Sequence, residues 1–219
     1  MHLHEFLAKV HEVVEPAVYL EVGVQHGTSL NLAHAASLAI GVDPFPLVAA
    51  TGNQRIAALP SDQYFEQFNV VQELLPFPPI DLGFIDGLHH FEQALRDFVN
   101  IEKFCHQRSI VIFDDVLPRN QAEASRTECP GDWTGDVWKI SKILRRYRPD
   151  LVILEVNTQP TGTLMVWAFG AKLEGSHNLE RVDTQEYLAM DEVPENVINR
   201  GYAVAPEFAL KMVKEFLAS

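Results

Sequence analysis

Short apolar runs alternate with amphipathic stretches along the chain, as in the βαβ units that build a largely parallel sheet. The apolar runs predict strands at residues 17–24, 39–43, 54–60, 80–87, 109–116, 151–156 and 163–169, of which the last two can form a hairpin. Helical spacing of apolar residues predicts helices at 28–39, 62–74, 91–105 and 206–217, and one more that carries Ile140, Ile143, Leu144 and Tyr147. The sequence therefore predicts a doubly wound α/β sheet.

Two long segments fall outside this alternation. Residues 117–137 are rich in Pro, Asn, Gly, Asp and Thr and predict a long loop, of the kind that forms lids or binding loops. Residues 172–205 are acidic and irregular. We predict one domain over residues 1–171, starting with a helix at 1–15, and a C-terminal helical appendage of the same domain at 172–219. The apolar stripe of Ala209, Met212, Val213 and Phe216 fits docking on this domain or a homodimer.

Composition narrows the function classes. The 219-residue chain has 17 basic and 30 acidic side chains, a formal charge of −13, which repels nucleic-acid phosphate and anionic lipid. No apolar run approaches the roughly 20 residues of a membrane span, and the N-terminus lacks the apolar core of a signal peptide. The two cysteines, Cys105 and Cys129, are too few for a disulfide framework. We therefore expect a cytoplasmic protein that binds neither nucleic acid nor membrane.

A glycine turn follows the first predicted strand. Gly23 and Gly27 allow the backbone to turn sharply and to approach a ligand, although their spacing is not that of the dinucleotide fingerprint. Asp43 follows the second predicted strand, where a carboxylate can accept hydrogen bonds from both hydroxyls of a ribose. The alternative for Asp43 is a turn residue before Pro44.

Acidic residues end two further strands. Asp86 ends one, and Asp114 and Asp115 end the next, so the three carboxylates should converge in the crevice where ligands bind. Their repulsion can be relieved by raised pKa values or by a hard cation such as Mg²⁺, which makes Asp86, Asp114 and Asp115 candidate metal ligands. The alternative is that one of the adjacent pair caps the following loop.

Histidines near these acids suggest proton transfer. His89 lies in the loop after Asp86, and we expect it to be a general base that takes a proton from a hydroxyl, with Asp86 as its catalytic partner. His90 is expected to face solvent at a helix start, and His26 to neighbour a cofactor. Other histidines, among them His2, His4 and His11, lie in segments without another chemical signal and are predicted to be surface residues.

Two tryptophans lie beside the long loop. Trp133 is expected to cover an acceptor ring or sugar, and Trp138 to pack its helix onto the sheet.

Together, YLEVGVQHG, GVDP, DLGFIDGLHHFEQALRDF, IVIFDDVLPRN and GDVWK resemble the class I S-adenosylmethionine-dependent methyltransferases. The sequence is similar to a small-molecule branch that contains macrolide-sugar O-methyltransferases and cephalosporin-hydroxylase-like proteins. The resemblance covers residues 17–170 and implies a Rossmann-like, seven-stranded sheet, mostly parallel with the last strand antiparallel.

The resemblance also implies roles for individual residues. Those expected around S-adenosylmethionine are Glu21, Gly23 and Gly27 on the methionine side, Asp43 at the ribose, and Ser61 and Asp62 near the adenine, together with His26 and Asp86. The acids matching Asp86, Asp114 and Asp115 are metal ligands in some members, several of which carry glutamate at position 114.

The leading hypothesis is O-methylation of a small hydroxylated acceptor, such as a sugar, a polyketide-like compound or a phenol. The alternatives are a divergent hydroxylase-like enzyme and a non-catalytic cofactor-binding protein. The acidic crevice predicts attraction of a cationic cofactor or metal and exclusion of a polyanionic acceptor.

Overall fold

The computed structural model describes residues 1–35, 37–71, 79–170 and 176–219. Its strands are β1 (Val18–Val22), β2 (Leu38–Val42), β3 (Gln54–Ala57), β4 (Ile80–Ile85), β5 (Cys105–Phe113), β6 (Val152–Val156) and β7 (Thr163–Trp167). Its helices are α1 (Leu3–Val14), α2 (Ser61–Val71), α3 (Phe91–Glu102), α4 (Lys139–Tyr147), α5 (Thr184–Leu188), α6 (Glu195–Ile198) and α7 (Pro206–Ala218), with 3₁₀ turns η1 (Leu30–Leu32) and η2 (Ser176–Arg181).

The strands form one seven-stranded sheet in the order β3-β2-β1-β4-β5-β7-β6. Strands β1 to β5 are parallel, whereas β7 runs antiparallel to both β5 and β6. The strand order reverses direction at β1 and β4, which is the point where ligands bind in open α/β sheets. The predicted doubly wound sheet with an antiparallel last strand is confirmed.

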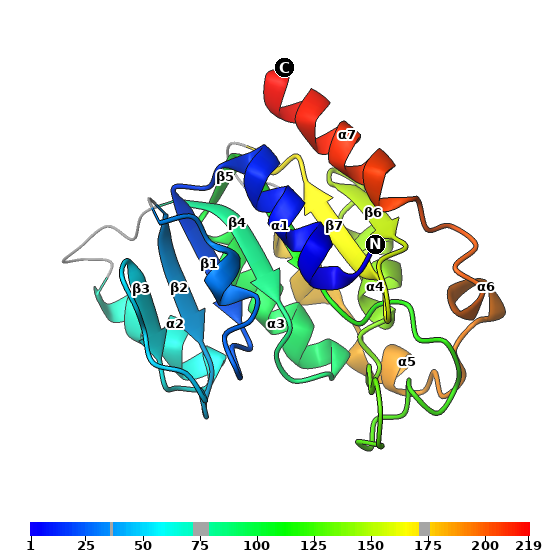
Figure 1. Ribbon diagram of the computed structural model, residues 1–219. Helices are drawn as coiled ribbons and strands as arrows, with labels where there is room; N and C mark the ends of the chain where they lie inside the picture. Colours follow the sequence, from blue (N-terminus) through cyan, green and yellow to red (C-terminus); the bar gives the residue numbers. More distant parts are fainter. Residues whose placement is uncertain (36, 72–78, 171–175) are drawn as a thin grey trace.

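Helices cover both faces of the sheet (Figure 1). Helix α1 and helix α7 lie side by side on one face, and α2, α3 and α4 lie on the other. Each strand alternates its side chains between two apolar cores: Leu20 and Val22 of β1 face the α3 side, and Tyr19 faces α1. Burial on both faces explains why the strands read as nearly continuous apolar runs.

The predicted helix at 28–39 is wrong. The described residues of this stretch, 28–35 and 37–39, form only the short turn η1 before β2 starts at Leu38. Its polar side chains bond to neighbouring elements instead of supporting a helix: the Ser29 hydroxyl donates to Glu21, and the Ser37 hydroxyl donates to the Pro16 carbonyl. These bonds tie the segment to β1 and to the connection between α1 and β1.

The C-terminal segment is integrated into the fold. Ala209 and Val213 of α7 are fully buried against α1 and the sheet, while η2 contacts α3 on the opposite face. The apolar stripe of α7 therefore docks on the chain's own domain, and a homodimer stays a prediction. His11 corrects another expectation, because it is buried in α1 with its ring edge-on to Tyr19.

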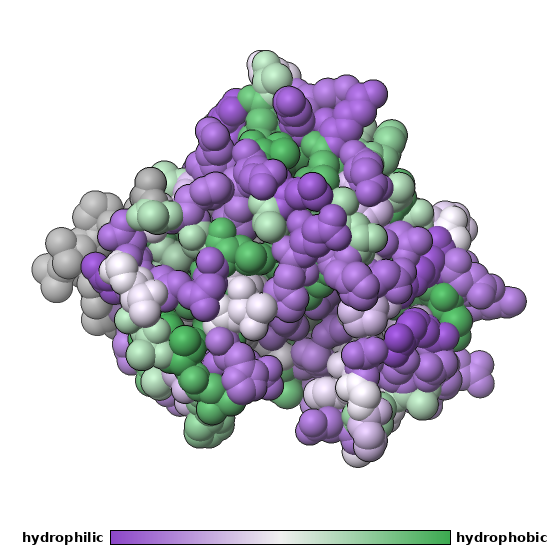
Figure 2. Space-filling view, in the orientation of Figure 1, coloured by the Kyte–Doolittle hydropathy of each residue, from purple (hydrophilic) through white to green (hydrophobic). Residues whose placement is uncertain are grey.

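The surface carries no extended apolar area on the face shown in Figure 2, where hydrophilic side chains surround small separate hydrophobic patches. Cys105 and Cys129 are free thiols. Among the described residues, no helix combines the length and apolar character needed to cross a membrane.

Candidate functional site

A cavity of about 920 Å³ opens at the carboxyl ends of the central strands. Val22 is in register with both Val42 and Ile85, and Ile85 is in register with Phe113, so the residues that follow these strands meet at one edge. The cavity is at the upper end of the size range of small-molecule sites. It lies at the switch point where the sequence analysis placed its candidates.

The glycine turn packs directly on the strand next to it. Gly23 has φ +92°, and a Cβ atom at this position would lie 1.9 Å from the backbone oxygen of Asp86. Gly27 has φ +71°, and its Cβ would lie 2.8 Å from a methyl group of Val48. Both positions therefore require glycine, as the sequence indicated. Gly23 lines the cavity, and Gly27 is not among the described residues that do.

Asp43 lines the cavity and holds the glycine turn in place. Its Oδ2 accepts hydrogen bonds from the backbone N–H groups of Val24 and Gln25 at 2.9 and 2.8 Å, and its Oδ1 accepts one from Phe45 at 2.7 Å. Asp43 therefore stabilises the turn, which was the alternative interpretation of this residue, and its carboxylate also lies at the cavity wall.

Glu21 lies beneath the turn, and it is not among the described residues that line the cavity. Its carboxyl group is fully buried and accepts hydrogen bonds from the hydroxyls of Tyr19 and Ser29 at 2.6 and 2.7 Å. Burial raises the pKa of Glu21 to about 8, with a smaller contribution from the charges of Asp86 and Asp43. Glu21 therefore supports the turn from below.

Ser61 and Asp62 also line the cavity, and their place near an adenine stays a prediction. The sequence analysis missed Gln93 and Asp97, which line the same wall. Asp97 accepts a hydrogen bond from Ser61 at 2.6 Å, and burial raises its pKa to about 6. The spacing of Gln93 and Asp97, one helical turn apart within an amphipathic helix, was the signal that could have identified them.

His89 lies between two carboxylates. Its Nε2 is 3.5 Å from Asp86 Oδ1 and 3.2 Å from Asp115 Oδ2. Its Nδ1 is 2.8 Å from the Trp133 carbonyl oxygen, which can only accept, so Nδ1 carries a hydrogen. Burial alone would lower the pKa of His89. The hydrogen bond to Asp86 and the negative charges of Asp115 and Asp86 have the larger combined effect, and the net result is a pKa raised to about 9. In its neutral form the ring exposes an Nε2 lone pair toward the two acids.

The three acids differ in their surroundings. Burial and the charges of Asp115 and Asp86 hold the pKa of Asp114 well above its usual range. Burial also raises the pKa of Asp115 to about 7, against the opposing effect of His89. Oδ1 of Asp114 is buried without a hydrogen-bond partner among the described residues. Ligand atoms of Asp86, His89 and Asp115 all lie within 4.8 Å of one another, so in the structure His89, and not Asp114, is the third member of the group with Asp86 and Asp115.

The long loop fixes the orientation of His89. Trp133 stacks on the imidazole with ring centroids 5.0 Å apart and an angle of 26° between the planes. Gly135 has φ +54° and lies so close that its Cβ would be 1.8 Å from the His89 carbonyl oxygen. Trp133 lines the cavity as expected, and Trp138 is buried under its helix as expected.

The remaining histidine predictions have mixed outcomes. His26 is exposed at the mouth of the cavity, which agrees with a place beside a cofactor. His90 precedes α3 and is half-buried, with Nε2 3.1 Å from the Arg126 carbonyl oxygen, so it is not simply solvent-facing. His4 is exposed but lines the cavity, which its local sequence did not indicate.

Comparison with known proteins points to one family. Residues 20–116 match the sequence model of a family described as a methyltransferase domain. No curated protein matches the chain.

Solved structures share the fold at low sequence identity. An O-methyltransferase from Bacillus cereus in complex with SAH is 15% identical, with TM-score 0.52 over 74% of this chain and 79% of that one. Cofactor-bound Rv0187 from MTB is 15% identical, with TM-score 0.58 over 75% and 78% of the two chains. The O-methyltransferase TomG from Streptomyces achromogenes in complex with SAM is also 15% identical, with TM-score 0.52 over 76% and 79%.

The family match spans β1 to the end of β5, the part of the sheet that builds the cavity and carries the glycine turn and the acids. The fold and this match confirm the resemblance found in the sequence. Residues 20–116 therefore match a methyltransferase domain, and the chain shares its fold with the solved O-methyltransferase structures.

Proposed function

We propose that this protein is an S-adenosylmethionine-dependent O-methyltransferase that acts on a small hydroxylated acceptor. The observation that carries the proposal is the shared cavity, which is lined by a glycine turn, by Asp43 and by a histidine that lies between two carboxylates. The family match and the fold support it, as do the SAM and SAH complexes named for similar structures.

The cofactor half is the part lined by Gly23, His26, Asp43, Ser61 and Asp62. Its volume and acidic lining suit a cationic sulfonium ligand with an adenosine group. Asp43 can still accept a hydrogen bond from a ribose hydroxyl at Oδ1, which accepts one bond from Phe45, whereas Oδ2 already accepts two. Glu21 contributes by holding the turn through Ser29.

Asp86 and Asp115 fit a divalent cation such as Mg²⁺, and Asp114 is the third candidate ligand. They supply hard oxygen ligands, and the buried Oδ1 of Asp114 lacks a partner among the described residues. Nε2 of His89 lies between Asp86 and Asp115, within 4.8 Å of their ligand atoms, so a cation held by the carboxylates alone would leave this nitrogen free to act as the base. When bound, such a cation would polarise the acceptor hydroxyl.

Methyl transfer from a sulfonium is an in-line displacement, in which the acceptor oxygen gains the methyl group and the sulfur keeps the electron pair of the broken bond. The protein contributes alignment and removal of the hydroxyl proton. We propose that Nε2 of the neutral His89 ring accepts this proton, because Nδ1 is committed to the Trp133 carbonyl oxygen. Since the pKa of His89 is raised to about 9, the neutral ring forms as the pH rises, and kcat should increase up to about pH 9. Asp86 then stabilises the charged ring that results.

Native mass spectrometry of the purified protein tests the proposal. We expect a retained SAM or SAH molecule, or the appearance of a one-to-one complex after incubation with millimolar SAM. A protein that stays unliganded under both conditions would overturn the proposed function.

A further inference from the structure

Asp136, near the end of the long loop, joins the loop to the start of α3, and its side chain is buried. Its Oδ1 accepts a hydrogen bond at 3.0 Å from the N–H of Phe91, the first residue of α3. Its own N–H donates to the His89 carbonyl oxygen at 3.2 Å. His90, the N-cap residue of α3, makes no side-chain cap hydrogen bond. Asp136 therefore takes the place of the missing cap and holds the residues on both sides of His90.

Two cations hold the carboxylate of Asp136. Its Oδ2 lies 2.8 Å from Nζ of Lys139 and 2.5 Å from a guanidinium nitrogen of Arg126. The side chains of Asp136 and Lys139 are each 2% exposed, so the loss of Asp136 alone would leave a buried, unpaired ammonium group. Arg126 also pairs with Glu92 of α3 at 2.5 Å, but both of these side chains are partly exposed, so this second tie to α3 should be weaker.

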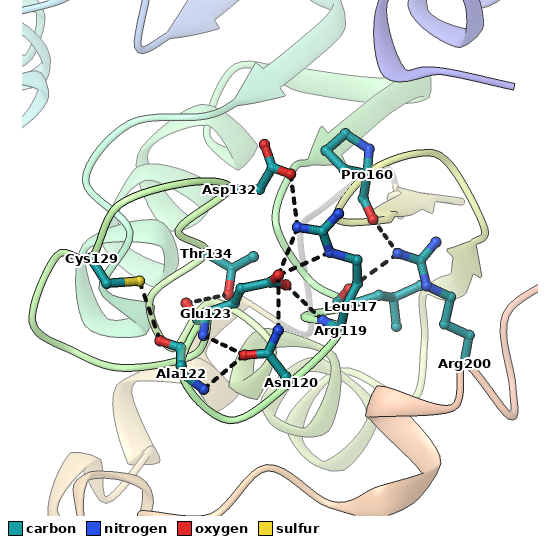
Figure 3. A network of polar contacts seen from close by, with 10 residues as sticks. All are labelled: Leu117, Arg119, Asn120, Ala122, Glu123, Cys129, Asp132, Thr134, Pro160 and Arg200. Carbon is teal, nitrogen blue, oxygen red and sulfur yellow. Dashed lines mark hydrogen bonds and ion pairs between the residues drawn. The ribbon is translucent and has the colours of Figure 1, made fainter.

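Side chains of the long loop tie the loop to itself (Figure 3). The Glu123 carboxylate accepts hydrogen bonds from the Arg119 guanidinium at 2.6 and 2.9 Å, and Arg119 also pairs with Asp132 at 2.8 Å. The Thr134 hydroxyl donates to the Glu123 carbonyl oxygen at 3.0 Å. Trp133 lies in the sequence between two of these residues, so the network holds the backbone of Trp133 as well.

The loop and the start of α3 meet at His89. The imidazole donates from Nδ1 to the Trp133 carbonyl oxygen and stacks on the Trp133 indole ring. Gly135 has no Cβ, which allows the loop backbone to lie against the His89 carbonyl. The half-buried His89 side chain could change rotamer if its own backbone and Trp133 were free to separate. Asp136 opposes this separation, because it bonds to both flanks of His90 and lies three residues after Trp133.

We propose that Asp136 is a positioning residue, which keeps the His89 ring stacked on Trp133 so that Nε2 stays between Asp86 and Asp115. This inference rests on the proposed function, since it explains how the proposed base keeps its orientation. Asp136 is not among the described residues that line the cavity, so it acts through His89 and does not touch a bound cofactor or acceptor.

NMR spectroscopy tests the position of His89 directly, through nuclear Overhauser effects between its imidazole protons and the indole protons of Trp133. The test variant is Asp136→Ala/Lys139→Met, in which both members of the buried ion pair are removed so that no ammonium group is left unpaired. The matched variant is Asp136→Asn/Lys139→Met, since asparagine retains an oxygen that can accept the Phe91 N–H.

Glu92→Gln is the control for the second tie, because it weakens the contact between Arg126 and α3 and leaves Asp136 in place. Thermal denaturation and titration calorimetry with SAM are run on every protein.

We expect the nuclear Overhauser effects in the unmodified protein, in Asp136→Asn/Lys139→Met and in Glu92→Gln. Asp136→Ala/Lys139→Met should lose them, while it still unfolds cooperatively and binds SAM as the unmodified protein does. Gly135→Ala tests the same contact if that variant does not fold, because its Cβ would lie 1.8 Å from the His89 carbonyl oxygen. Gly52→Ala is its control, with φ +55° against +54° and no described atom within 4 Å of the Cβ position. Gly135→Ala should lose the effects and Gly52→Ala should keep them.

Unchanged nuclear Overhauser effects in Asp136→Ala/Lys139→Met, or in Gly135→Ala, would overturn the role of Asp136. Their loss in Glu92→Gln or in Asp136→Asn/Lys139→Met would overturn it too, because the hydrogen bond to Phe91 would then not be what holds the ring. Failure of the proposed function is a different result: the unmodified protein would not bind SAM, whereas the contact between His89 and Trp133 would be unaffected.

Discussion

Gly23 lies directly against the backbone of Asp86, so that any Cβ atom at position 23 would stand 1.9 Å from the Asp86 carbonyl oxygen. This contact joins the turn at the proposed cofactor half to the strand end that carries Asp86, the proposed partner of His89. Gly23→Ala should push the two apart and misplace both. We expect SAM affinity to fall at least tenfold and the melting temperature to drop by several degrees, measured by calorimetry and thermal denaturation.

Gly52→Ala is the matched control for this substitution. Gly52 also has a positive φ, +55°, but no described atom lies within 4 Å of its Cβ position. Gly52→Ala should lower the free energy of unfolding by the cost of backbone strain alone, of order 1 kcal/mol, and should leave the SAM affinity unchanged. Similar losses of SAM affinity in the two variants would mean that the contact with Asp86 is unimportant.

His89→Gln should lower kcat by about 100-fold or more, which is the usual contribution of a general base, while SAM binding is retained. The adjacent His90 provides a control, because its ring contacts the Arg126 carbonyl and not the acids. His90→Gln should keep kcat within a few-fold of the unmodified protein. If both variants had the same kcat, His89 would not be the base.

Mg²⁺ should stabilise the protein, because a ligand that binds only the folded state adds about 2.7 kcal/mol at 100 times its Kd. We expect the melting temperature to rise by several degrees in millimolar Mg²⁺, and the rise to disappear in Asp115→Asn. Asp132→Asn is the control, since Asp132 is paired with Arg119 outside the group of Asp86, His89 and Asp115. An equal rise in all three proteins would argue against a site at these acids.

Glu21 should make stability depend on pH. Burial raises its pKa from 4.5 to about 8 in the folded protein, so between these values the folded state binds more protons than the unfolded chain. Stability from this group therefore falls as pH rises through this window. Glu21→Gln has no such titration. The difference in melting temperature, variant minus unmodified protein, should therefore increase by several degrees from pH 5.5 to pH 8.5. A difference that stays constant with pH would show that Glu21 is ionised throughout.

The ends of the parallel strands were the part of the site that the sequence could predict. Asp43, Asp86 and Asp115 each follow an apolar run, and residues in such positions must meet at one edge of the sheet. The local pattern carries this information because strand length and burial on both faces are visible in the sequence.

Contacts between distant segments were not predictable in this way. His4 reaches the cavity only because Leu3 pairs with Gln159, and no local pattern encodes that pairing. The helix expected at 28–39 failed for a related reason, since its apolar spacing is helical while Ser29 and Ser37 bond to other elements. Asp97 joins the cavity through its packing against Ser61.

Titration calorimetry with SAM is the measurement that tests the central claim most directly, with the unmodified protein and Asp43→Asn compared side by side. The geometry predicts saturable one-to-one binding by the unmodified protein. It also predicts at least tenfold weaker binding by Asp43→Asn, because the substituted amide would face the backbone N–H groups of Val24 and Gln25. No heat of binding with the unmodified protein at millimolar SAM would contradict a cofactor site in this cavity.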